Sequence, residues 1–223
     1  MSLSSIELRG ALGNHRDMLN LRLVLWTVAA LGLLFQVGHF FEHAFQFVVW
    51  LLGDLSEICG RDTPWASAWA SNLIDRIGLV VAPTADVPRR WMLGLEVLHV
   101  IGNSIFLATL GLLYYLTRNR WVRWGLYIEA FHLYEHIMLT YTVYYVGKPI
   151  GLSTLFGEVE LGSKEFAVGF RVTWHFVMNL LPMPLAMIGL MEYWEEHRPA
   201  WSVSSQRKQS FDGPAIIGGD SGR

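Results

Sequence analysis

Two octapeptides inside long apolar stretches decide the fold of this chain: residues 36–43 read QVGHFFEH, and residues 129–136 read EAFHLYEH. The second copy begins 93 residues after the first and keeps the same spacing of a polar residue, a histidine, a glutamate and a histidine. Each copy is followed by an apolar stretch that carries a histidine and, four residues later, an asparagine, at 99–103 and 175–179. The pattern predicts a chain built from two similar halves.

The composition is that of a membrane protein. Of the 223 residues, 52% are hydrophobic and only 16% are charged, and the mean hydropathy is +0.33. A helix needs roughly 20 apolar residues to cross about 30 Å of hydrocarbon. Four stretches reach this length, at about 21–52, 91–116, 121–146 and 168–193. We therefore predict an all-α integral membrane protein whose four transmembrane helices form a bundle.

The duplication predicts that these helices form two tandem hairpins. Each hairpin starts on the same side of the membrane, so the repeats are parallel and their pseudo-twofold axis runs along the membrane normal. The expected divisions are an N-terminal segment, two hairpin repeats with one outer loop each, and a disordered tail: 1–20, 21–116 (outer loop 53–90), 117–198 (outer loop 147–167) and 199–223.

The placement of arginine predicts the orientation of the helices. Arginines precede the first stretch and fill the connection between the second and third (Arg9, Arg16 and Arg22; Arg118, Arg120 and Arg123). Because basic residues are enriched on the cytoplasmic side, we expect both termini and this connection to be cytoplasmic and the protein to lie in the plasma (inner) membrane. Cys59 then falls in the first outer loop. The net charge of −2 gives no reason to expect a nucleic-acid partner.

Both outer loops carry some expected structure. Trp65, Trp69, Leu73 and Ile77 recur at helical spacing, which predicts a short helix lying on the outer interface of the bilayer. The loop 147–167 is rich in glycine, which predicts a hairpin or an irregular cap.

The histidines of the repeated patterns fall at one depth in the predicted bundle. At about 1.5 Å of rise per residue, all four helices place them between the middle and the outer surface of the membrane. Spacings of three, four and seven residues put the polar side chains of each helix on a single stripe. Ionisable groups at this depth are costly, so we expect the stripes to face one another and to form one functional site.

Imidazole and carboxylate groups together predict a metal site. They suit iron, zinc, copper or manganese, and the site is expected to hold one or two ions. Glutamate and histidine three residues apart on facing helices also build the di-metal centres of soluble four-helix bundles. The expected metal ligands are His39, Glu42, His43, His99, His132, Glu135, His136 and His175. The expected supporting residues are Gln36, Glu96, Asn103, Glu129, Tyr134 and Asn179.

Other interpretations of the same residues stay open. Histidines on two helices could instead hold haem b. A single HxxEH pattern is also that of a metallopeptidase, although two copies at matched depth fit such a site badly. Polar residues such as Asn103 or Asn179 also serve to pair helices within membranes. Arg171 could pair with Glu96 or reach the outer surface.

A buried site with several histidines and carboxylates is typical of oxidation chemistry. We predict a metal-dependent membrane oxidoreductase that acts on an apolar or quinol substrate. Two alternatives are a haem b electron-transfer subunit and a metal-ion or proton transporter. A structural subunit of a membrane complex is a further possibility. The expected partners are the lipid bilayer, such a substrate and the other subunits of a complex.

Overall fold

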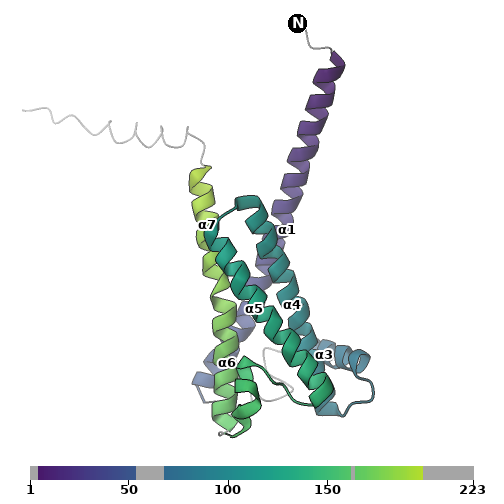
Figure 1. Cartoon of the computed structure of the whole chain (residues 1–223), viewed down its shortest axis with the longest axis vertical. Coiled ribbons are helices and arrows are strands. Elements are labelled where there is room, and N and C mark those ends of the chain that lie inside the picture. The colour runs from purple at the N-terminus through teal and green to yellow at the C-terminus, as the bar shows by residue number, and fades with distance from the viewer. Residues whose placement is uncertain (1–4, 54–67, 162–163, 198–223) are drawn as a thin grey trace, which may run out of the picture.

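The structure is a computed structural model that describes residues 5–53, 68–161 and 164–197, in which every regular element is a helix (Figure 1). The elements are α1 (Ser5–Leu51), α3 (Ala68–Val81), α4 (Val87–Thr117), α5 (Arg120–Val146), the 3-10 helix η1 (Leu152–Leu161), α6 (Lys164–Leu180) and α7 (Pro182–Glu196). Cys59 and the tail expected to be disordered, 199–223, lie outside the described residues.

Three segments are long and apolar enough to cross a membrane: Asn20–Leu51 of α1, the whole of α4, and Phe166–Glu196, which joins α6 to α7. The prediction of an all-helical membrane protein is confirmed at this level. Helix α5 is 27 residues long but does not meet the same criterion, because glutamates, histidines and tyrosines interrupt its apolar sequence. The fourth span, the membrane orientation and the arrangement as two repeated hairpins stay predictions.

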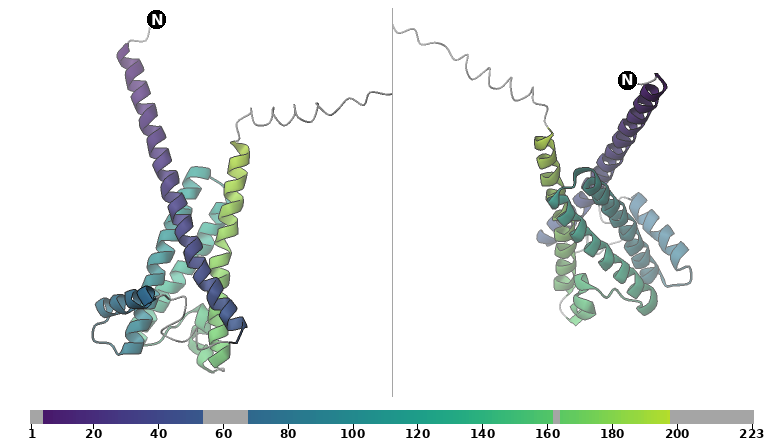
Figure 2. Two further views of the ribbon diagram at one scale, coloured as in Figure 1. Left: turned by 180° about the vertical axis from the view of Figure 1, so that it is seen from behind. Right: turned by 45° about the horizontal axis from the view of Figure 1, so that its top comes forward.

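Helix α1 is longer than the span predicted for it. It begins at Ser5, and its N-terminal part projects away from the other helices (Figures 1 and 2). Its C-terminal half packs against α4 on one side and α6 on the other. The stripe 36–43 therefore reaches the middle of the bundle.

Helices α4 and α5 are antiparallel and are joined by a tight turn. Helix α4 ends at Arg118, which adopts a left-handed conformation with φ of 53°. Asn119 then caps α5, because its side-chain oxygen accepts a hydrogen bond of 2.7 Å from the backbone amide of Trp121. This turn crosses the predicted boundary between the two repeats and places the stripes of α4 and α5 face to face.

The predicted fourth span, 168–193, is broken near its centre. Pro182 has no amide hydrogen for a helical hydrogen bond, so α6 ends at Leu180 and α7 begins at the proline. The chain continues in nearly the same direction (Figure 1). Helix α6 carries the residues that face the site, and α7 packs against α5.

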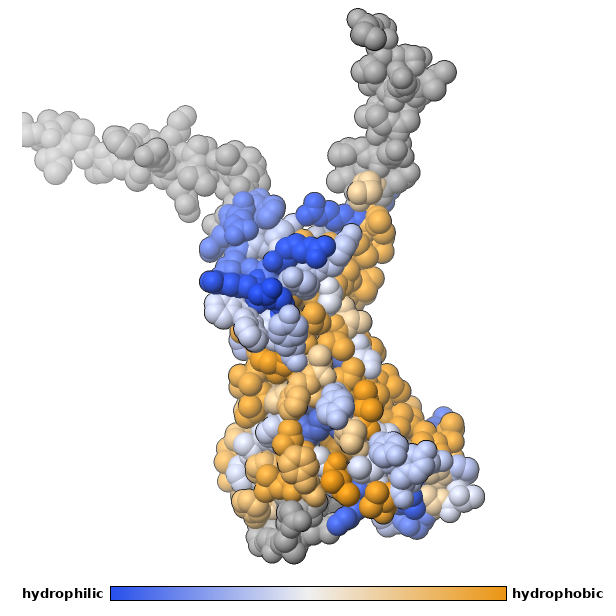
Figure 3. All heavy atoms as spheres, in the orientation of Figure 1, coloured by the Kyte–Doolittle hydropathy of each residue, from blue (hydrophilic) through white to orange (hydrophobic). Residues whose placement is uncertain are grey.

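The bundle interior has two kinds of packing along its length. An apolar core lies toward the end that carries the α4–α5 turn and is formed by Ala29, Phe106, Leu110, Leu113, Val122 and Ala186. The other half contains the buried histidines and a smaller apolar cluster of Ala82, Leu93 and Val143. The outside of the bundle is largely apolar, and hydrophilic residues gather at the end with the α4–α5 turn (Figure 3). This surface is the one expected of a protein within a bilayer.

The helix expected over the outer loop is present as α3, although Trp65 lies outside the described residues. Glycine allows its backbone to approach α4 closely. A Cβ atom at Gly94 would lie 2.0 Å from the carbonyl oxygen of Ile74, and one at Gly78 would lie 2.1 Å from that of Arg90. The irregular cap expected over 147–167 contains η1, which packs against α6.

We expect Gly94→Val to detach α3 from α4, because backbone cannot move aside as a flexible side chain can. Proteolysis within α3 should become at least tenfold faster than in the unaltered protein. Gly111→Val is the matched control on the same helix, since a Cβ there would meet only Leu126, at 4.0 Å. Equal protection of α3 in both variants would contradict this account of the contact.

Candidate metal centre

Six imidazole rings from four helices form one continuous cluster in the half of the bundle away from the α4–α5 turn. Each ring has at least two others near it, with ring centroids 4.7–6.2 Å apart. The rings belong to α1, α4, α5 and α6: His39 and His43, His99, His132 and His136, and His175. The structure therefore brings together all six histidines that the repeated patterns contain.

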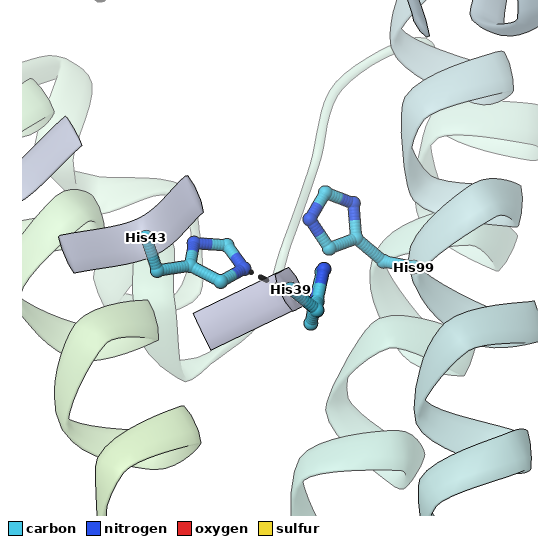
Figure 4. A group of neighbouring side chains, drawn as sticks. All are labelled: His39, His43 and His99. Atoms are coloured by element: carbon cyan, nitrogen blue, oxygen red, sulfur yellow. Dashed lines mark hydrogen bonds between the residues drawn. The ribbon is translucent and has the colours of Figure 1, made fainter. Parts of the chain in front are cut away.

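The first group of three is formed by His39 and His43 of α1 with His99 of α4, and we call it the first triad (Figure 4). One nitrogen from each ring can be chosen so that all three lie within 4.8 Å of one another. The Nε2 atoms of His39 and His43 are 3.3 Å apart. Nitrogens that share an ion are about 3–4 Å apart, since each bond to the metal is about 2.0–2.1 Å long.

The second group, which we call the second triad, contains His132 and His136 of α5 and His175 of α6. Its candidate ligand nitrogens also lie within 4.8 Å of one another, and all three side chains are buried. Three buried nitrogens of this triad have no hydrogen-bond partner among the described residues: Nδ1 and Nε2 of His132, and Nε2 of His136. Buried polar atoms normally have one. One nitrogen of His132 and the Nε2 of His136 are therefore free to bind a metal, since a neutral imidazole has one lone pair to offer.

The two triads adjoin each other. The rings of His99 and His136 are stacked, with centroids 4.8 Å apart and planes 3° from parallel. The rings of His43 and His175 are also stacked, with centroids 5.8 Å apart. Two ions held by the triads would therefore occupy one dinuclear site.

Hydrogen bonds fix the orientation of three rings. The Nδ1 atom of His99 lies 2.9 Å from the backbone carbonyl oxygen of the residue four positions earlier. The Nδ1 atom of His175 lies 2.8 Å from the corresponding carbonyl oxygen on its own helix. In His136, Nδ1 lies 2.9 Å from Oε2 of Glu96. A carbonyl or carboxylate accepts a hydrogen from Nδ1, so Nε2 keeps its lone pair for a metal.

Glu96 is fully buried and forms a second strong contact. Its other oxygen, Oε1, pairs with the guanidinium of Arg171 on α6. Of the two possibilities that the sequence offered for Arg171, the ion pair with Glu96 is therefore the one present. Glu96 joins α4, α5 and α6 through one carboxylate.

Glu135 was expected to be a ligand, but both of its oxygens have other partners. Oε1 accepts a hydrogen bond of 2.6 Å from the backbone amide of Ser153 in η1. Oε2 accepts one of 2.5 Å from the indole of Trp174 on α6. This carboxylate therefore fastens η1 and α6 to α5 beside the second triad. Neither donor was identified from the sequence, since a backbone amide has no sequence signature and tryptophan is common at membrane surfaces.

The other two carboxylates of the octapeptide copies lie beside a histidine of their own helix. Glu42 Oε2 is 3.7 Å from Nδ1 of His39, and Glu129 Oε2 is 3.7 Å from Nδ1 of His132. Glu129 is fully buried, and neither of its oxygens forms a hydrogen bond with the described residues. The side chain of Glu42 is 31% exposed.

The remaining expected supporting residues divide into two kinds. Gln36 donates a hydrogen bond of 2.9 Å to Asn179, which in turn donates one to the backbone carbonyl of His175. Asn103 is buried without a hydrogen-bond partner among the described residues. The supporting role expected of Tyr134 stays a prediction. Tyr134 is 59% exposed, because a neighbour of Glu135 in a helix points about 100° away from it.

The chain belongs to a family of unknown function, DUF6008, whose model matches residues 11–213. This match covers every helix that the structure describes, except the first residues of α1. Neither the curated proteins nor the solved structures contain a match to the chain.

Proposed function

We propose that this member of the family holds two transition-metal ions inside the membrane and uses them in an oxidation–reduction reaction. The observation that carries the proposal is the arrangement of six rings as two adjoining triads, each with three nitrogens placed to share an ion. Helix α5, which carries two of the histidines, would then be the fourth membrane span.

The energetics of burial support the presence of metal. A buried polar atom without a partner destabilises a protein by about 1–3 kcal/mol. His43, His132 and His136 contribute four such nitrogens, and Glu129 contributes two such oxygens. Divalent ions would give one nitrogen of each ring a partner and would offset the negative charge of the nearby carboxylates.

The ligand set limits the chemistry. Nitrogen donors suit iron, copper and zinc, and three ligands per ion leave a coordination position open for another molecule. The cluster lies beside a largely apolar outer surface, which favours a substrate that dissolves in the bilayer. A hydroquinone fits this environment. Its oxidation to a quinone releases two electrons and two hydroxyl protons. Two ions of iron or copper held by the triads would supply acceptors for the electrons, and the carboxylates of Glu42 and Glu129 beside them would take up the protons.

Haem b, the alternative expected from the same histidines, fits the geometry less well. A haem needs two rings on opposite faces of a wide, flat macrocycle. In this cluster each ring has at least two other rings within 6.2 Å, in several orientations, which leaves no layer for the macrocycle.

Metal analysis of the purified full-length protein tests the proposal. We expect two ions of iron, copper or zinc per chain, no Soret band, and reduction of redox-active ions when decyl hydroquinone is added without oxygen. A protein that takes up no metal would contradict the proposed site. A strong Soret band would instead establish the haem alternative.

A further inference from the structure

The two triads differ in how far they are enclosed, although the sequence repeats make them similar. In the first triad the side chain of His39 is 13% exposed, and that of the adjacent Glu42 is 31% exposed. In the second triad the side chain of His132 is fully buried, and so is the adjacent Glu129. The first triad is therefore the one that an outside molecule can approach.

The carboxylates of the two octapeptides differ in the same way. Each oxygen of Glu135 already has a donor from the protein, one in η1 and the other in Trp174. Glu42 occupies the equivalent place in the first copy, and its Oε2 lies 3.7 Å from Nδ1 of His39. Glu42 is therefore available to accept a hydrogen bond from a bound molecule.

Between α1 and α4, the residues near the first triad are small or apolar, and Gly102 is buried there beside the ring of Phe35. Gly102 lies three residues after His99, about one turn along α4. A Cβ atom at Gly102 would meet only the ring of Phe35, 3.9 Å away. Phe35 is itself one turn before His39 on α1 and is 47% exposed. Gly38, next to His39 in the sequence, is exposed on the outside of the bundle with no side chain over it. A molecule that reaches the triad between these helices comes from the hydrocarbon of the membrane.

We infer that the two metal positions are inequivalent, and that the first triad is the exchangeable position, which binds a membrane-dissolved molecule with a hydroxyl group. Glu42 accepts the hydrogen bond from that hydroxyl, and the apolar part of the molecule lies against Phe35 between α1 and α4. The second triad holds its ion closed off from such molecules. This inference rests on the proposed function, since it assigns different roles to the two ions of that site.

Chelation of the cobalt(II)-substituted full-length protein tests the inequivalence. The apolar chelator 1,10-phenanthroline should remove one cobalt ion at least tenfold faster than the other. The fast phase should disappear in His39→Ala and the slow phase in His132→Ala, because each variant removes one ligand from one triad. Equal rates for the two ions, or a fast phase that disappears in His132→Ala, would overturn the inference while leaving the dinuclear site intact. A protein that takes up no cobalt would instead contradict the proposed function itself.

The same cobalt protein tests the ligand and its route. Decyl hydroquinone, added without oxygen, should shift the visible cobalt spectrum, and the shift should be lost in Glu42→Leu. Gly102→Leu should slow the fast phase of chelation at least tenfold, since its side chain fills the approach beside Phe35. Gly111→Leu is the matched control and should leave the rate unchanged. Equal rates in the two glycine variants, or a spectral shift that persists in Glu42→Leu, would show that the approach or the acceptor is wrongly assigned.

Discussion

Replacing His43 and His136 with alanine together should abolish the stabilisation that metal gives to the protein. The double variant removes one ligand from each triad at positions that the repeat makes equivalent. At a free metal concentration a hundredfold above its dissociation constant, each ion contributes about 2.7 kcal/mol to the free energy of unfolding. For a chain of this size that is a rise of about 5–10 °C in melting temperature per ion. Thermal unfolding in detergent, with and without metal, measures the difference.

His197→Ala is the matched control for the double variant. His197 is exposed and caps the C-terminal end of α7, the end away from α6. Its Nδ1 lies 2.8 Å from the backbone carbonyl oxygen of Tyr193. We expect it to keep the full metal-dependent rise. If metal stabilises the double variant as much as the unaltered protein, the triads are not the binding site, and these histidines serve to pair helices.

Arg171→Met should destabilise the protein by about 3–5 kcal/mol, because it leaves a buried carboxylate without its charged partner. Glu96 is fully buried, and its two oxygens are bonded to Arg171 and His136. Methionine retains the length and the apolar part of the arginine side chain. The melting temperature of the metal-free protein in detergent measures the effect separately from metal binding.

Adding Glu96→Gln to Arg171→Met should restore most of the lost stability. The amide of glutamine has no charge to neutralise, and its oxygen can still accept the hydrogen bond from Nδ1 of His136. A double variant that is no more stable than Arg171→Met alone would show that the loss comes from packing around the guanidinium and not from the unpaired carboxylate.

The sequence predicts which residues face one another better than it predicts what each of them bonds to. Helical spacing determines which side chains lie on the same side of a helix. The stripes 36–43 and 129–136 therefore already indicated that the histidines share the interior. The bonds of Glu135 depend on how η1 folds back over α5, and no local pattern contains that information. Glu135 was therefore expected to bind metal, whereas the structure gives both of its oxygens to other donors.

The last of the predicted spans, 168–193, contains a break that the sequence already signals through its prolines. Pro182 and Pro184 stand inside the stretch 168–193, which hydropathy alone presents as one continuous helix. The break at Leu181 separates the segment that faces the histidine cluster from the one that faces the apolar core. Hydropathy averages over about 20 residues, so it does not register a single residue that lacks an amide hydrogen.

The low apolar content of α5 has a consequence for how the protein reaches its membrane. Glutamate and histidine near the centre of a helix make its transfer from the translocon into lipid unfavourable. Helix α5 carries Glu129, His132, Glu135 and His136 there, so it is poorly suited to partition by itself. The turn of Arg118 and Asn119 joins it directly to α4, which is apolar enough to cross alone. We expect the two helices to leave the translocon as a pair, so that assembly of the site begins during synthesis.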